Sequence, residues 1–171
     1  APSATSLTRI TGTPAAAVAP ASPGYNDSYE AVFGMSYAQL RAMATVVVTN
    51  MSAFPSPLPQ NGLVIIDTGG PVTIGPPKPL IGNAILIVKG NLTMNDGNNA
   101  NFNGMLYVEG NATLRAPSLI RGGVLCTGTL TMQGVGDYAT IQYDSAVLTT
   151  LMAHVGNYTS RNSPLIPCNA R

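Results

Sequence analysis

Apolar and polar residues alternate in short segments through the middle of the chain. Each segment follows one of four glycines, Gly70, Gly90, Gly110 and Gly128, whose spacings are 20, 20 and 18 residues. Starting at the second residue after each glycine, the sequence is Val-Thr-Ile, Leu-Thr-Met, Ala-Thr-Leu and Leu-Thr-Met in turn. Side chains that alternate with a period of two are typical of β-strands. The pattern therefore predicts at least one short strand in every repeat.

The length of the repeat limits the kind of fold. A unit of 18 to 20 residues is shorter than a strand-helix-strand unit, which takes about 30 residues. It is long enough for two or three strands joined by tight turns, in which glycine and asparagine supply the positive φ. We predict a mainly β fold: a short single-chain parallel β-solenoid of about four to five coils. Right-handed winding is the default for parallel crossovers.

The register divides the repeat into inward and outward positions. Inward positions hold mostly aliphatic side chains, namely Val72, Ile74, Leu86, Val88, Leu92, Met94, Leu106, Val108, Ala112, Leu114, Val124, Cys126, Leu130 and Met132. One outward column consists of Thr73, Thr93, Thr113 and Thr131. Threonine is a good strand former, so a solvated strand face explains this column; a hydroxyl array that binds a ligand is the alternative.

A second outward column, formed by Ile87, Tyr107 and Leu125, is apolar. An apolar strip of this kind needs a cover. We expect an amphipathic helix of the same chain, at residues 36–47, to supply it, because that helix must also bury its own apolar face. The alternative cover is the N-terminal arm of a neighbouring subunit, laid across as an extended strand.

Helices are predicted on both sides of the repeat. Asp27 or Ser28 begins a short helix that Gly34 ends, and Ser36 begins the next. After a strand at residues 140–143, a last helix begins at Asp144 or Ser145 and is expected to end at residue 156. We expect these helices to cover the open ends of the solenoid, because uncovered strand edges pair with other chains.

The chain divides into four parts on this basis. Residues 1–24 are rich in Ala, Pro, Ser and Thr and are predicted to be an arm or linker. Residues 25–60 form a helical cap and a proline-rich connection. Residues 61–143 form the solenoid, and residues 144–171 form a capping helix and a tail.

Composition favours an exported protein. Only 9% of the residues are charged, against about 25% in ordinary soluble domains. The formal net charge is +1, which provides no broad positive surface for nucleic acid or membrane. No apolar stretch is long enough to span a bilayer, and we expect the chain to be a mature form or an ectodomain.

Two cysteines, Cys126 and Cys168, are separated by 42 positions. This spacing does not resemble a zinc site. A disulfide that ties the tail to the last coil is the natural interpretation for an exported protein, and two unpaired thiols are the alternative.

Three motifs together resemble a known family. They are Phe-Gly-Met-Ser at residues 33–36, the Gly-Met-Leu-Tyr-Val-Glu-Gly-Asn-Ala-Thr-Leu coil at residues 104–114, and Tyr-Asp-Ser-Ala-Val-Leu at residues 143–148. Over residues 28–152 the chain is similar to the C-terminal solenoid region of PilX-like type IV pilus assembly proteins, which are related to minor pilins. The resemblance implies an extracellular or cell-surface module whose partners are other subunits of a pilus or filament. It implies no catalytic residues and no cofactor, although such proteins begin with a membrane-spanning helix that this sequence does not show.

A solenoid that binds a ligand is the second hypothesis. The threonine column suggests ice or glycan as the ligand. DNA is the weaker choice, because Lys89, Arg115 and Arg121 are few and Glu109 lies among them.

An enzyme that acts on polysaccharides ranks third. It would need two neighbouring carboxylates, which Asp67 with Asp96 or Glu109 could supply at one corner. His154 has no evident nucleophile beside it, and the calcium-like segment at residues 95–99 is best explained as a polar corner turn.

Overall fold

The computed structural model describes residues 8–13, 26–134 and 136–161 of the chain. Strands account for most of the regular structure. In chain order the elements are β1 (Thr8–Thr13), α1 (Tyr29–Phe33), α2 (Tyr37–Met43), β2 (Val46–Val48), the 3-10 helix η1 (Met51–Ala53), β3 (Gly62–Ile66), β4 (Val72–Ile74), β5 (Ile81–Lys89), β6 (Leu92–Met94), β7 (Ala100–Glu109), β8 (Ala112–Arg115), β9 (Ser118–Cys126), β10 (Leu130–Gln133), β11 (Ala139–Asp144) and α3 (Ser145–Arg161).

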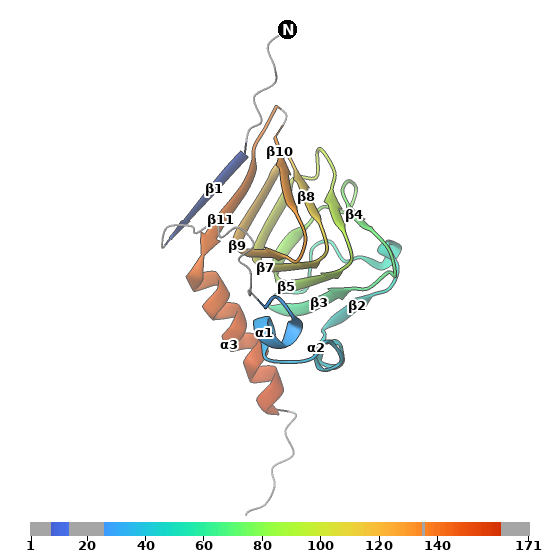
Figure 1. Cartoon of the computed structure of the whole chain (residues 1–171), viewed down its shortest axis with the longest axis vertical. Helices are drawn as coiled ribbons and strands as arrows, with labels where there is room; N and C mark the ends of the chain where they lie inside the picture. Colours follow the sequence, from blue (N-terminus) through green and yellow to red (C-terminus); the bar gives the residue numbers. More distant parts are fainter. Residues whose placement is uncertain (1–7, 14–25, 135, 162–171) are drawn as a thin grey trace, which may run out of the picture.

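The strands stack into a parallel β-solenoid of about five turns, as the repeat predicts (Figure 1). One sheet has seven strands in the order β1-β11-β9-β7-β5-β3-β2, and the other has four in the order β10-β8-β6-β4. All pairings between these strands are parallel. Each coil alternates a long strand of the first sheet with a short strand of the second.

Glycines allow neighbouring coils to approach closely inside the long strands. Gly104 in β7 has φ +150°, and a Cβ there would lie 1.9 Å from the carbonyl oxygen of Ala84 in the preceding coil. Gly122 in β9 repeats the arrangement, with φ +120° and a distance of 2.2 Å to the Gly104 oxygen. A side chain at either position would collide with the backbone of the coil before it.

The interior of the solenoid is an apolar stack. The predicted inward residues of β4 to β8 are buried there, and Val124, Cys126 and Met132 pack against the same cluster as half-buried side chains. Leu130 is the exception, because 36% of its surface is exposed. It lies on β10, the outermost strand of its sheet, and no further coil of the described structure stacks on it.

The helices begin where the capping residues predict. Ser28 accepts a hydrogen bond from the Ala31 amide, and Gly34 ends α1 with φ 70°. Ser36 forms a capping box with Gln39 at the start of α2. The expected helix does not extend to Val47, because Val46–Val48 is the strand β2 and pairs with β3.

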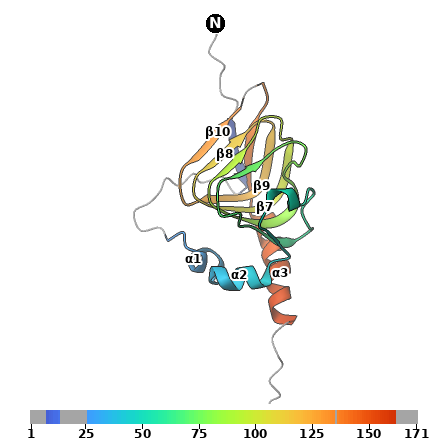
Figure 2. The ribbon, with the colours of Figure 1, turned by 90° about the vertical axis from the view of Figure 1, so that its right-hand side faces the viewer.

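The helices cover the side of the solenoid and not its ends, which corrects the expected capping role. Leu40 of α2, Leu151 of α3 and Val32 of α1 pack against the outer face of the seven-stranded sheet. Figure 2 shows all three helices on the same side of the stacked strands.

The two ends of the stack differ. At the first coil, Val48, Phe54 and Leu58 are 1%, 2% and 5% exposed and belong to the interior cluster. The proline-rich connection provides two of these side chains, and the Leu58 amide donates to the Ile81 carbonyl. We call this the closed end. The open end lies at the last coil and comprises Val124, Cys126, Leu130 and Met132, which are half-buried or exposed.

The described part of the predicted arm or linker, residues 8–13, is a strand. Thr8–Thr13 forms β1, which lies parallel to β11 at the edge of the seven-stranded sheet. At the other terminus, Asp144 caps α3 by accepting from the amides of Ala146 and Val147. The helix passes the expected end at Gly156 and continues to Arg161.

Candidate functional site

The predicted threonine column is present and regular. Thr73, Thr93, Thr113 and Thr131 occupy the same register on β4, β6, β8 and β10. Neighbouring parallel strands are about 4.8 Å apart, so the four side chains form an evenly spaced row. The first and last are exposed and the middle two are half-buried. We call this surface the threonine face; the helices lie on another side of the solenoid (Figure 1).

The apolar column is covered by the chain itself. Ile87, Tyr107 and Leu125 are register partners on β5, β7 and β9. Ile87 and Tyr107 are 0% and 1% exposed, and Leu125 is half-buried. The sequence predicts the helix beginning after Ser36 alone as this cover, but the cover comes from all three helices: Leu40 of α2 lies in the same cluster as residues of α1 and α3. The prediction that this column could be an exposed assembly surface is therefore wrong.

Tyr107 is the centre of this cover. Its ring lies 5.0 Å from that of Tyr29 and 5.4 Å from that of Phe33, both on α1. Its hydroxyl donates a hydrogen bond of 2.7 Å to the Asp27 carbonyl. Aromatic pairs at such distances add to the stabilisation from buried area, so Tyr107 fixes α1 on the solenoid.

A polar corner lies beside this cover. Its charged residues were named from the sequence, but the grouping of all three was not predicted. Asp67, Lys89 and Glu109 line a cavity of about 330 Å³ where the long strands end. Lys89 and Glu109 are register partners, and Asp67 follows Ile66, the partner of Val88. The signal was present in the sequence, because these three charged residues stand at the end of a strand, or directly after it, in successive coils.

Each carboxylate of the polar corner accepts a hydrogen bond from a helix. Tyr29 of α1 donates to Glu109 at 2.7 Å, and Tyr37 of α2 donates to Asp67 at 2.6 Å. Burial, followed by the Glu109 hydrogen bond, raises the pKa of Tyr29. The same two causes, with Asp67 as the acceptor, raise the pKa of Tyr37. Both phenols are thereby held as donors.

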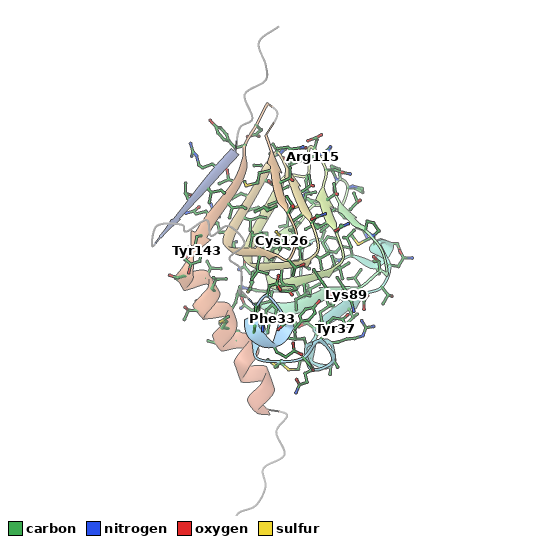
Figure 3. The ribbon with its side chains drawn as sticks, viewed as in Figure 1. Phe33, Tyr37, Lys89, Arg115, Cys126 and Tyr143 are labelled. Carbon is green, nitrogen blue, oxygen red and sulfur yellow. The ribbon has the colours of Figure 1, made fainter. Side chains whose placement is uncertain are left out.

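Two cations complete the corner. Arg41 of α2 forms an ion pair of 3.0 Å with Asp67. The Lys89 ammonium lies 4.3 Å from the centre of the Tyr37 ring, and Figure 3 shows the two side chains next to each other. Asp67 therefore has a tyrosine hydroxyl and a guanidinium as partners, and Glu109 has a tyrosine hydroxyl. This arrangement fastens α1 and α2 to the coils.

The remaining charged candidates are dispersed. Asp67 and Glu109 share the polar corner, but Asp96 lies at another corner and pairs with Arg115 at 3.3 Å. Arg115 and Lys89 are far apart in Figure 3, and Arg121 belongs to the first half of β9. The three cations considered for DNA do not form one patch.

Two further candidates have ordinary structural roles. His154 is exposed on α3, with its Nδ1 2.7 Å from the Thr150 carbonyl oxygen. Residues 95–99 form a corner turn in which Gly97 and Asn99 have positive φ. Within residues 8–13, 26–134 and 136–161, no three His, Cys, Asp or Glu side chains are grouped to hold a metal ion.

Cys126 lies at the end of β9, at the open end. Its side chain is half-buried, its sulfur lies 3.5 Å from the Gly128 carbonyl oxygen, and burial raises the pKa of its thiol. Cys168 lies outside the described residues. The Cys126–Cys168 disulfide therefore stays a prediction.

A second cavity, of about 280 Å³, lies near the closed end beside the threonine face. Thr73, Phe54, Pro76 and Lys78 are among its lining residues. The Lys78 ammonium donates to the Ser52 carbonyl across it.

Comparison with known proteins found no match: no family model matches, and no curated sequence or solved structure is similar to the chain. The resemblance to PilX-like proteins therefore rests on the sequence motifs alone. In the part of the chain that the structure describes, none of the helices is both long and apolar enough to cross a membrane.

Proposed function

We propose that this chain is a non-enzymatic extracellular surface module and a structural, adhesive part of a pilus or another filament. The observation that carries the proposal is the difference between the two ends of the solenoid. The closed end buries Phe54 and Leu58 almost completely, whereas 36% of Leu130 is exposed at the open end. Over the described ranges of the chain, one end of the stack is covered and the other exposes apolar side chains, which suits a subunit that receives a partner in one direction.

The open end has the properties of a receiving surface. β10 is the outermost strand of its sheet, so one row of its backbone groups is free of a neighbouring strand within the described structure. Such an edge is a template for another strand. The side chains at this end, Val124, Cys126 and Met132, are apolar and half-buried, and a partner that covers them gains apolar burial.

The test is where the protein is found and whether the open end holds it there. We expect the full chain to sediment with filaments sheared from its source. The variant Leu130→Lys should reduce this fraction at least about tenfold, because it places a charge in the contact. Met152→Lys is the matched control, since Met152 is also apolar and exposed, but on α3.

Two results would contradict the proposal. One is recovery of the unaltered protein only as a free species in the medium. The other is an equal loss for the Leu130 and Met152 variants, which would show that the open end has no special role.

Glycan binding by the threonine face is the second candidate function. The supporting observation is the row of four threonines in register, with a cavity beside Thr73. Replacing Thr93 and Thr113 by valine keeps their shape and removes two hydroxyls. If each hydroxyl makes a bond worth about 0.5 to 1.5 kcal/mol, binding to immobilised polysaccharide should weaken by about tenfold. The matched Thr→Ser pair should retain binding, and equal binding by all three proteins would reject this function.

A further inference from the structure

Among the strands that the structure describes, β1 alone joins the last coil from a distant part of the sequence. All six of its residues pair in parallel with β11, from Thr8 with Ala139 to Thr13 with Asp144. Ile10 continues an inner row that runs through Phe102, Ile120 and Ile141 on successive strands. β1 therefore acts as one more rung at the open side of the seven-stranded sheet.

Backbone hydrogen bonds hold β1 more than side-chain packing does. Arg9 and Thr11 are exposed, and 43% of Ile10 is exposed. The Arg9 guanidinium lies 5.2 Å from the centre of the Tyr138 ring. A strand bound in this way makes the same bonds to any β11 edge of the same sequence, because main-chain pairing gives the affinity.

The connection between β1 and α1 is long enough for β1 to pair outside its own molecule. Residues 14–25 separate Thr13 from Asn26, and twelve residues span up to about 40 Å when extended. The far end of this connection is fixed to the side of the solenoid, because Tyr107 donates to the Asp27 carbonyl at 2.7 Å. This maximum exceeds the diameter of a small domain, about 30 Å, so the length of the connection permits β1 to reach β11 of an adjacent copy.

We propose that β1 is exchanged between copies, so that β1 of one molecule occupies the β11 edge of a second copy of this chain. The proposal rests on the proposed function and adds a contact between copies at the β11 edge, beside the open end. All six paired positions are remade in the exchanged form, so protein concentration sets the balance between the two forms. Donor and acceptor are different surfaces, and the contact is heterologous: it lengthens a chain of copies wherever it does not close on itself.

Cross-linking between two single variants tests the exchange. The variants are Thr11→Cys and Gln142→Cys, whose positions are register partners, made in chains that also carry Cys126→Ala and Cys168→Ala. One variant is labelled with heavy nitrogen. The two are mixed at high concentration, oxidised and digested. Parallel strands about 4.8 Å apart satisfy the Cα separation of about 4.4 to 6.8 Å that a disulfide needs.

We expect a peptide that joins position 11 of one label to position 142 of the other. Its yield should exceed by at least about fivefold that of the control pair Thr11→Cys with Thr140→Cys, because Thr140 is offset by two residues in the register. The double variant Thr11→Cys/Gln142→Cys shows that the cysteines react when the strands pair. Deletion of residues 1–13 should abolish concentration-dependent assembly and leave the circular dichroism of the solenoid in place.

The exchange is overturned if the double variant cross-links only within single chains and the mixture gives no more product than the offset pair. It is also overturned if the deletion variant assembles like the full chain. Should the exchange fail while the full chain still sediments with filaments, the proposed function stands with another partner at the open end. If the protein does not sediment with filaments but the cross-link forms, the proposed filament function is rejected and the exchange of β1 is retained.

Discussion

Replacing Gly104 by alanine places a methyl group against the backbone of the neighbouring coil. The new Cβ would lie 1.9 Å from the Ala84 carbonyl oxygen and 3.0 Å from a methyl carbon of Leu151. Contacts below 3.0 Å do not persist, so the two coils must separate locally by about 1 Å. The carbonyl is part of the parallel ladder between β5 and β7, and it cannot move without weakening that ladder.

The magnitude follows from two costs. A non-glycine residue held at a strongly positive φ costs about 1 to 3 kcal/mol, and overpacking a close-packed site costs about 1 to 3 kcal/mol. We expect Gly104→Ala to lower the free energy of unfolding by about 4 kcal/mol. For a chain of this size that corresponds to a decrease in Tm of about 12 °C.

Two matched glycines separate these costs. Gly69 has φ +73° with open space around it, so Gly69→Ala retains only the backbone cost of about 1 to 2 kcal/mol. Gly70 is also open and its φ lies outside the positive region, so Gly70→Ala should be neutral or stabilising by about 0.4 to 1 kcal/mol. Thermal unfolding, monitored by circular dichroism, ranks the three variants by Tm. A Tm for Gly104→Ala within about 2 °C of that for Gly69→Ala would refute the contact between the coils.

The remaining predictions concern the helices and the tail. Because burial and the Glu109 hydrogen bond raise the pKa of Tyr29 above its ordinary value of 10.0, the stabilisation from the protonated phenol is complete below pH 10.0 and is lost as the pH rises beyond it. Thermal unfolding between about pH 8 and about pH 11 should show this decline, and Tyr29→Phe should reduce it. Ser36→Ala removes the capping box of α2 and should cost about 1 kcal/mol in urea denaturation, with an unchanged midpoint as the contrary result. Non-reducing mass spectrometry of protein from its source should find Cys126 joined to Cys168, a closure worth about 3 to 4 kcal/mol, and two free thiols would contradict it.

Much of the solenoid could be predicted because the repeat carries its own register. The glycines before each short strand and the alternation around Thr73, Thr93 and Thr113 state which residues stack and which face inward. The same rule failed at Leu130. Burial of an inward position depends on the next coil, and the described structure places no such coil beyond β10.

The errors outside the repeat have a common cause in long-range contacts. Thr8–Thr13 contains only one apolar residue, Ile10, and its composition is that of an extended arm or linker; it forms a strand because β11 lies beside it. Val46–Val48 continued the spacing of a helix, but three β-branched residues favour a strand once β3 is available for pairing.

The polar corner shows what a repeat does not encode. Asp67, Lys89 and Glu109 could be aligned from the sequence, since Lys89 and Glu109 end their strands and Asp67 directly follows one. Their partners Tyr29 and Tyr37 lie on helices, and no periodic pattern states how a helix docks on a coil. The sequence therefore predicts the residues that the coils contribute to the polar corner, but not those that the helices contribute.

The position of β1 also determines the order in which the molecule can fold. Each coil pairs with one made about 20 residues earlier, a local contact that closes quickly, whereas Thr8 must wait for Ala139. Closing so long a loop costs more entropy than closing any single coil. A newly made chain therefore completes β2 to β11 with its first strand still unattached. If β1 is exchanged as proposed, the finished β11 edge is open during that interval to whichever copy of β1 reaches it first, so the rate at which new chains accumulate, and not only their final concentration, would decide how they become linked.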